Sequence, residues 1–319
     1  MTPESPGGRQ HGKSSTFHGR SLMTISAPVL EGTGASQAEV RMKPAVPIKI
    51  IKPYSERSLV GDLADVWAHR ELALVLARRE ISIRYSQTVV GLLWVLLQPL
   101  ITTAIFTMVF VFFLRIPDQD GSFYPLFAFS GIVVWQYFTR IVSDGGNSLV
   151  SSSAMITKVS FPRMIIPLIA PIAAGLDCLI AIAALVALTL AFGAHLSWMV
   201  IFTPLVVLAV GLFGYSIALW LAPLNAVYRD IGIVMPFVIQ IAMYLSPIVY
   251  PASLVPEKIR WFYELSPVAV MVDSMRWAVL GTNAPSLVGI GVFIVATVLL
   301  FWGGARLFRR MESTLVDRI

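Results

Sequence analysis

Residues 164–192 read MIIPLIAPIAAGLDCLIAIAALVALTLAF, a long apolar run that carries a single charged side chain, Asp177. About 20 apolar residues in a helix are enough to cross the hydrocarbon core of a bilayer, which is roughly 30 Å thick. The stretch therefore predicts a membrane-spanning helix, and it decides the fold class for the rest of the chain.

Six runs of this kind occur along the sequence. The composition agrees, because 56% of the 319 residues are hydrophobic and 13% are charged, about half the charged share of a soluble domain. A mean hydropathy of +0.76 excludes a disordered chain and argues against an ordinary cytosolic enzyme. We predict an all-α integral membrane protein with spans at Val89–Leu114, Tyr124–Gly145, Met164–Phe192, Ser197–Leu221, Ile231–Tyr250 and Leu287–Phe308.

The positions of Lys and Arg predict the orientation of these spans. Twelve of the 24 lie within residues 1–85, before the first span. If both termini are cytoplasmic, eleven near-membrane cations lie inside, and only four lie outside, namely Arg115, Lys258, Arg260 and Arg276. This asymmetry favours cytoplasmic termini. The single cysteine, Cys178, excludes an intrachain disulfide.

The chain before the first span divides into two segments. Residues 1–60 are polar and are predicted to be a disordered cytoplasmic extension. Within it, residues 7–14 (GGRQHGKS) match the phosphate-binding loop pattern, but no buried strand precedes them, so we assign them no nucleotide. Residues 65–85 predict a basic amphipathic helix in the membrane interface, with a solvated linker helix as the alternative. Residues 86–310 form the transmembrane domain and 311–319 a cytoplasmic tail.

Residues 251–281, between spans five and six, are too charged to cross the bilayer and too apolar for a plain loop. Short re-entrant helices suit such a segment, because protein or a cavity then shelters the backbone at membrane depth. We predict such helices on the outer side of the membrane.

Asp177 is an acid deep within the third predicted span. An unpaired carboxylate there costs at least about 2.5 kcal/mol. It is either a pore-facing or gate-coupled acid, or the partner of a cation on another helix. Arg276 is a possible partner. Arg140 is disfavoured, because its distance from the outer start of the second span places it near the cytoplasmic face.

The sequence predicts no catalytic, cofactor or metal site in this chain. The four histidines are scattered without metal-ligand spacing, and no hydrolase or metalloprotease motif is present. Transport would then be passive, ion-driven or powered by a partner. Residues 147–163 (NSLVSSSAMITKVSFPR) form a long connection between spans two and three, which favours a docking element over an ordinary polar turn.

Several short motifs follow one another over about residues 70–310: RYSQT at 84–88, GLLW at 91–94, QPL at 98–100, YPLFA at 124–128, ITKVSFPR at 156–163, LN and YRD at 224–230, SPIVY at 246–250 and LVPEK at 254–258. With them the chain resembles the ABC-2 type transporter permeases of the polysaccharide-export family, the membrane subunits of O-antigen, teichoic-acid and capsule exporters. Ser266-Pro267 departs from the Asn-Pro that is frequent in relatives, which leaves the fine geometry of the gate open.

The resemblance implies a homodimer in the bacterial inner membrane with two copies of a cytoplasmic P-loop ATPase, which bind ATP and magnesium. It implies export of a lipid-linked polysaccharide and no nucleic-acid partner. It places the ATPase-coupling helix at Ile156, Thr157, Lys158, Phe161, Pro162 and Arg163. It also places the periplasmic gate at Trp261, Phe262, Tyr263 and Arg276.

A sugar polymer needs a wide path with surfaces on which it can slide, and aromatic rings suit the C–H faces of sugars. Candidates for this lining are Phe106, Phe110, Trp135, Tyr137 and Phe138, with helix packing or lipid contact as the alternative. Arg78, Arg79 and Arg84 could meet a diphosphate headgroup at a cytoplasmic entrance, although charge bias alone explains them equally well. A permease for a small lipid or drug, and an ion-coupled transporter, are the competing functions.

Overall fold

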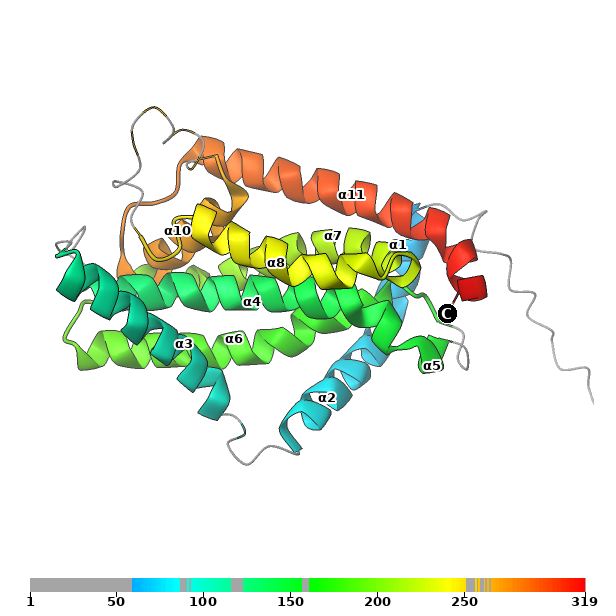
Figure 1. The fold of residues 1–319 in the computed structure, drawn as a ribbon, viewed down its shortest axis with the longest axis horizontal. Helices are drawn as coiled ribbons and strands as arrows, with labels where there is room; N and C mark the ends of the chain where they lie inside the picture. Colours follow the sequence, from blue (N-terminus) through cyan, green and yellow to red (C-terminus); the bar gives the residue numbers. More distant parts are fainter. Residues whose placement is uncertain are drawn as a thin grey trace, which may run out of the picture. The chain divides into compact units, whose positions relative to one another are not determined.

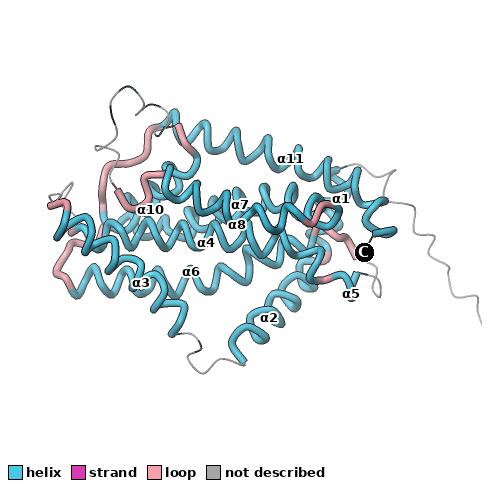
Figure 2. Tube along the Cα trace, viewed as in Figure 1, coloured by secondary structure: helices cyan, strands magenta, loops and turns pink. Residues whose placement is uncertain are grey.

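The computed structural model describes residues 59–86, 91, 93–115, 123–156, 161–250, 256, 258, 261, 263 and 265–318, and gives no side chains for 59, 60, 156 and 313–318. These residues belong to one unit of the chain, residues 52–319. Within them the regular structure is helical and contains no strand (Figure 2). The predicted all-α class is confirmed for this part of the chain.

Among the described residues, five helices are long and apolar enough to cross a membrane. They follow the predicted order closely, because each one fills a long and predominantly apolar run. They are α3 (Leu93–Thr107) with its π-helical continuation η2 (Met108–Phe113), α4 (Tyr124–Ser151), α6 (Ile165–Ala191), α7 (Thr203–Val227) with the preceding 3-10 turn η3 (Trp198–Phe202), and α11 (Leu287–Arg318).

The fifth predicted span is shorter than expected. Helix α8 covers Asp230–Leu245, 16 residues, which corresponds to about 24 Å at 1.5 Å per residue. It ends because Ser246 precedes Pro247 and adopts an extended conformation (ψ 147°), as the residue before a proline usually does. Helix length by itself therefore supports five crossings among the described residues, and a crossing by α8 stays a prediction.

Helix α4 is the centre of the bundle and packs against α3, α6, α7 and α10 (Figure 1). In the most apolar 18-residue stretch of each helix, 78% of the residues are buried in α4, compared with 11% in α3 with η2 and 17% in α11. Small residues permit this close packing. A Cβ on Gly145 would lie 2.6 Å from the Cβ of Ala218 in α7, so that only glycine fits there.

The predicted interfacial helix over residues 65–85 forms two helices, α1 (Leu59–Ala68) and α2 (Arg70–Ser86). They meet at His69, whose Nδ1 lies 2.7 Å from the carbonyl oxygen of Asp65. Helix α2 packs against α6 and buries Ala73 and Ala77, two small residues one turn apart.

The two ends of the bundle differ. The four-residue helix α5 (Ser153–Ile156) lies at the same end as the C-terminal part of α11, whereas α10 (Pro267–Leu280) lies at the other end (Figure 1). Gly281 ends α10 in the left-handed region (φ 69°), which glycine adopts without strain. The backbone N–H of Ser197 donates to the carbonyl oxygen of Val279 over 3.2 Å, so that α10 is tied to the start of the fourth apolar helix.

Candidate functional site

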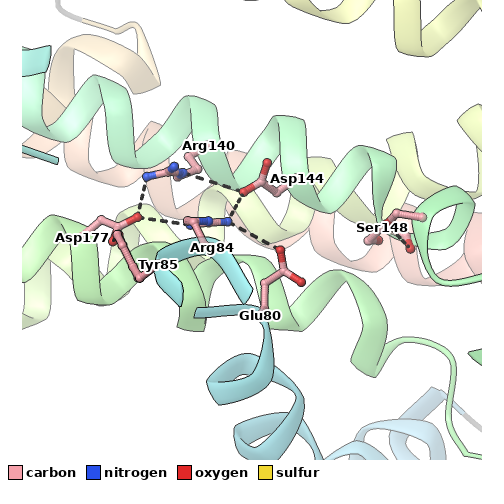
Figure 3. Close-up of polar contacts among 8 residues, drawn as sticks. Glu80, Arg84, Tyr85, Arg140, Asp144, Ser148 and Asp177 are labelled. Carbon is pink, nitrogen blue, oxygen red and sulfur yellow. Dashed lines mark hydrogen bonds and ion pairs between the residues drawn. The ribbon is translucent and has the colours of Figure 1, made fainter. Parts of the chain in front are cut away.

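Asp177 is the centre of a charged cluster inside the bundle (Figure 3). Its Oδ2 accepts from Nη1 of Arg140 at 2.5 Å and from Nη1 of Arg84 at 3.2 Å, while Oδ1 accepts from the hydroxyl of Tyr85. Nη2 of Arg84 also reaches Oδ2 of Asp144 at 3.0 Å. The carboxylate in the membrane is therefore compensated by two guanidinium groups and one phenol.

Three elements supply these side chains at the same depth. Arg140 lies eleven residues before the end of α4 and Asp177 twelve residues after the start of α6, which gives about 17 and 18 Å along the helices. Arg84 comes from α2, eleven residues after Ala73 and seven after Ala77, and so continues the buried face of that helix.

Our prediction of the partner of Asp177 was wrong. We favoured Arg276 and disfavoured Arg140 because the distance of Arg140 from the outer start of the second span places it near the cytoplasmic face. Asp177 lies twelve residues after the start of α6, at about the same depth as Arg140, so that the two side chains meet. Arg84, which we placed at the cytoplasmic entrance, is a second partner. The spacing of Ala73, Ala77 and Arg84 on one face of α2 was the available signal.

Arg276 has a different environment. Its side chain is 3% exposed, and it donates to the backbone carbonyl oxygens of Ile248 (2.6 Å) and Pro247 (3.3 Å). The guanidinium also lies 3.5 Å from the ring centroid of Phe127 and 3.2 Å from Asp273. Arg276 thus fastens α10 to α4 and to the turn that follows α8, at the end of the bundle where we predicted a gate.

A cavity of about 380 Å³ opens beside Asp177, between α2, α3, α4 and α6. One part of its wall is polar and includes the charged cluster. The other part is apolar and includes an indole. The polar wall consists of Arg84, Tyr85, Gln98, Gln136, Arg140 and Asp177, and the apolar wall of Trp94, Val95, Val133, Tyr137, Ala174, Cys178 and Ala181. We call this space the Asp177 cavity.

A polar stripe runs along α4 next to this cavity. Between Leu126 and Leu149 every residue of α4 is buried except six, and all six are polar: Gln136, Thr139, Arg140, Ser143, Asp144 and Asn147. Their spacing of three and four places them on one face of the helix. A second cavity of about 350 Å³, lined by most of the stripe together with residues of α3 and α8, lies against this face. This spacing is visible in the sequence, but we did not predict a site from it.

Of the predicted pore aromatics, Tyr137 lines the Asp177 cavity, and the other four lie outside it. Trp135, Tyr137 and Phe138 are buried in the core of the subunit, where Phe138 stacks on Phe213 with ring centroids 5.6 Å apart. Phe110 stacks on Tyr124 at 5.8 Å and Phe106 is partly buried. Their role in lining a path remains a prediction, because a packing role accounts for the contacts of the three buried rings.

The remaining predicted residues are spread over the molecule. Arg78 and Arg79 are exposed on α2, and Trp261 is exposed with its Nε1 donating to the carbonyl of Lys258 over 3.0 Å. Tyr263 is half-buried and hydrogen-bonded to Tyr250. Thr157, Lys158 and Phe262 lie outside the described residues, as do residues 7–14 with the phosphate-loop pattern, while Ile156 ends α5 without a described side chain.

The described part of the coupling segment faces inward. Phe161 and Pro162 pack against the neighbouring helices. Arg163 donates to the carbonyl oxygen of Glu312 at 3.1 Å and forms an ion pair with its carboxylate at 3.7 Å. This contact connects the segment to the end of α11. Nearby, Asp62 of α1 pairs with Arg309 of α11 at 3.0 Å.

Among the residues that the structure describes, no group of three or more His, Cys, Asp or Glu side chains could hold a metal ion. Several long apolar helices around a polar stripe and two cavities define the chain as a multi-spanning membrane transport protein. Residues 71–280 match the model of the ABC-2 type transporter family, and the chain belongs to that family. Members are transport subunits that work with an ATPase on a separate chain.

Curated relatives are similar over most of their length. The chain is 28% identical to the O-antigen export system permease protein RfbA of Klebsiella pneumoniae over 208 residues, which covers 65% of this chain and 79% of the relative. It is 22% identical to RfbA of Myxococcus xanthus over 257 residues, covering 80% and 98%. It is also 28% identical to the inner membrane transport permease YadH of Escherichia coli K12 over 241 residues, covering 69% and 91%. The family resemblance predicted from the motifs is confirmed.

Proposed function

We propose that this chain is the membrane-spanning subunit of an ATP-driven exporter that moves a lipid-linked, O-antigen-like polysaccharide across the bacterial inner membrane. The similarity to the O-antigen export permeases carries this proposal, because it extends over 98% of the relative from Myxococcus xanthus. ATP and magnesium would bind to the partner ATPase.

The polar stripe of α4 supports a hydrophilic substrate. Other exposed faces of the long helices carry large apolar side chains, for example on α3, α8 and α11, as expected for contact with lipid or another subunit. A partly exposed face with polar residues only is costly against lipid. It suits a path that a hydroxyl-rich polymer follows, since each stripe residue offers a hydrogen-bond donor or acceptor.

The proposed assembly is a homodimer with two copies of the ATPase. In it, residues 156–163, with Lys158 among them, contact the ATPase. The inward ion pair between Arg163 and Glu312 would pass movement of this segment on to α11. Both termini would be cytoplasmic, with α5 and the end of α11 on the ATPase side.

Entrance and exit are proposed at opposite ends of the bundle. The exposed Arg78 and Arg79 on α2 would meet the diphosphate of the lipid carrier. Helix α10 with Trp261 and Tyr263 would form the periplasmic gate, held in place by Arg276. Cysteine introduced at Trp261 should react with an impermeant maleimide from the periplasm. Reaction only from the cytoplasm would contradict this placement.

Deletion of the gene tests the function. We expect the surface polysaccharide to disappear and lipid-linked polymer to accumulate inside the cell, and the wild-type gene to restore export. Normal surface polysaccharide with altered efflux of a small lipid or drug would instead support the competing permease function. Transport that continues without any ATPase partner would support an ion-coupled transporter.

A further inference from the structure

The Asp177 cavity combines two kinds of wall that together select a ligand. Its volume of about 380 Å³ lies near the lower end of the range of small-molecule sites, roughly 300–1,000 Å³. The charged cluster forms one side, and Trp94, with 57% of its surface exposed, lies on the apolar side. A ligand that fits must offer both polar groups and an apolar face.

The cationic charges beside the cavity are already compensated. Arg84 and Arg140 face the three carboxylates of Asp177, Asp144 and Glu80 (Figure 3). A diphosphate would have to displace one of these carboxylates from its guanidinium partners. The side chain of Asp177 is 8% exposed, and leaving it unpaired there would be expensive. A neutral ligand carries no such penalty.

Hydroxyl groups suit this balanced cluster. Each hydroxyl donates one hydrogen bond and accepts others, whereas carboxylates only accept and guanidinium groups only donate. Neighbouring hydroxyls on a sugar ring can therefore contact Asp177 and Arg140 together, and the amides of Gln98 and Gln136 add both donors and acceptors. The flat apolar face of an indole fits the C–H face of the same ring.

We propose that the Asp177 cavity is a binding site for a single uncharged sugar ring, with Trp94 as the stacking platform and Asp177, Arg140, Gln98 and Gln136 as the hydrogen-bonding groups. Gln98, Gln136 and Arg140 also line the cavity along the polar stripe. A sugar ring bound in the Asp177 cavity can therefore belong to a polysaccharide that lies along the polar stripe. The inference rests on the proposed function and assigns it a sugar-recognition site within each subunit.

Binding is tested on the full chain, purified with its own partners in lipid nanodiscs. The probes are methyl α-D-mannopyranoside, methyl β-D-glucopyranoside and methyl β-D-galactopyranoside, with inorganic pyrophosphate as the anionic comparison. Saturation-transfer difference NMR reports binding. Modification of Cys178, the single cysteine of the chain and part of the cavity wall, reports occupancy. At three times Kd, a glycoside should slow modification by methyl methanethiosulfonate about fourfold.

The variants separate stacking in the cavity from binding elsewhere. Trp94→Ala should raise the Kd for the glycoside about tenfold, which is ~1.4 kcal/mol, while Trp94→Phe should keep most of the affinity. Trp198→Ala, an exposed tryptophan on η3 outside the cavity, should match the wild type. If Trp94→Ala does not fold, Gln98→Ala at an exposed position gives the same test.

Three results would overturn the proposal: no saturation transfer with any of the glycosides, equal binding by wild type and Trp94→Ala, or protection of Cys178 by pyrophosphate alone. The gene deletion is independent of these measurements. Loss of surface polysaccharide without glycoside binding would refute the sugar site and leave the export function standing. Glycoside binding with unchanged surface polysaccharide would refute the export function and leave the site standing.

Discussion

Two buried charges, Asp177 in α6 and Arg276 in α10, have opposite kinds of partners. Asp177 is held by side chains from α2 and α4, next to an open cavity. Arg276 is held mainly by backbone carbonyl groups of residues 127, 247 and 248 and by the ring of Phe127. Side chains can change rotamers and partners, whereas carbonyl groups move only with their backbone.

This difference indicates which of the two sites can rearrange locally. The Asp177 cluster links α2 to α4 and α6 through long side chains of which Arg140 is 39% exposed. Its partners can exchange with water or ligand. Arg276 and its carbonyl partners, which we call the Arg276 centre, are buried and closed to solvent. Helix α10 therefore moves only together with the turn after α8.

Replacement of Arg276 should have the largest effect on stability. Arg276→Leu leaves at least two buried carbonyl oxygens without their donor, and each such loss costs about 1–3 kcal/mol. We expect the largest fall in the thermal midpoint of the purified protein among these variants. Arg276→Lys should recover only part of it, because an ammonium cannot reproduce the guanidinium fork. Full stability of Arg276→Leu would contradict the closed centre.

Asp177→Asn should be the next most harmful change. It removes the charged acceptor of Arg84 and Arg140, and hydrogen bonds to charged groups contribute about 1.5–3 kcal/mol. Water reaches both arginines and offsets part of this loss, so that about 2 kcal/mol is expected. Release of α2 should also speed trypsin cleavage at Arg78 and Arg79.

Asp144→Asn is the matched control for this variant. Asp144 is 42% exposed, and loss of its ion pairs with Arg84 and Arg140 should cost about 0–1 kcal/mol. Equal effects of the two substitutions on the thermal midpoint would contradict the larger contribution to stability that we assign to the buried carboxylate of Asp177.

Gly131→Ala tests how tightly the Arg276 centre is closed. A Cβ on Gly131 would overlap the carbonyl oxygen of Ile248 and lie 3.0 Å from Nη2 of Arg276. Such overpacking costs about 1–3 kcal/mol. The control is Gly175→Ala in α6, where no atom lies within 4 Å of the new methyl group, and a gain of about 0.5–1 kcal/mol is expected there. Equal thermal midpoints for the two variants would refute the close contact.

Tyr85→Phe should have the smallest effect, and it depends on pH. Burial, followed by the hydrogen bond to Asp177, raises the pKa of Tyr85 from 10.0 to about 12. Neutral Tyr85 therefore contributes its full stabilisation below pH 10, and this contribution is lost as the pH rises from 10 to 12. The difference in thermal midpoint between wild type and variant should be constant from pH 7 to 9 and shrink above pH 10. A difference that grows above pH 10 would contradict the assignment.

Much of the fold was predictable because apolar runs have a direct physical meaning in a membrane. Each of the five long helices fills a run that the sequence shows. We did not predict that Ser246-Pro247 shortens the fifth predicted span, although the residue before a proline seldom stays helical. The break of the N-terminal helix at His69 had no comparable signal, since histidine is common in helices.

The sequence indicated several residues of the candidate site, but it did not indicate which of them form ion pairs with one another. Asp177 and Arg84 were recognised as costly or functional, and the i, i+3, i+4 spacing of the polar stripe was visible from Gln136 to Asn147. The predicted aromatic residues that alternate with this stripe, Trp135, Tyr137 and Phe138, are buried in the structure. Hydrophobic patterning does not report which face of a helix is covered by neighbours.

The amino-acid sequence was enough to predict that this chain crosses a membrane, which family it belongs to, and which charged side chains lie in apolar surroundings. Composition and local motifs suffice for these, because transfer from water to lipid depends on each segment alone. The tertiary structure was needed to show that Asp177 pairs with Arg140 and Arg84, and that Arg276 donates mainly to carbonyl groups. Such pairing depends on the relative depth and rotation of separate helices, which no single segment of the sequence reports.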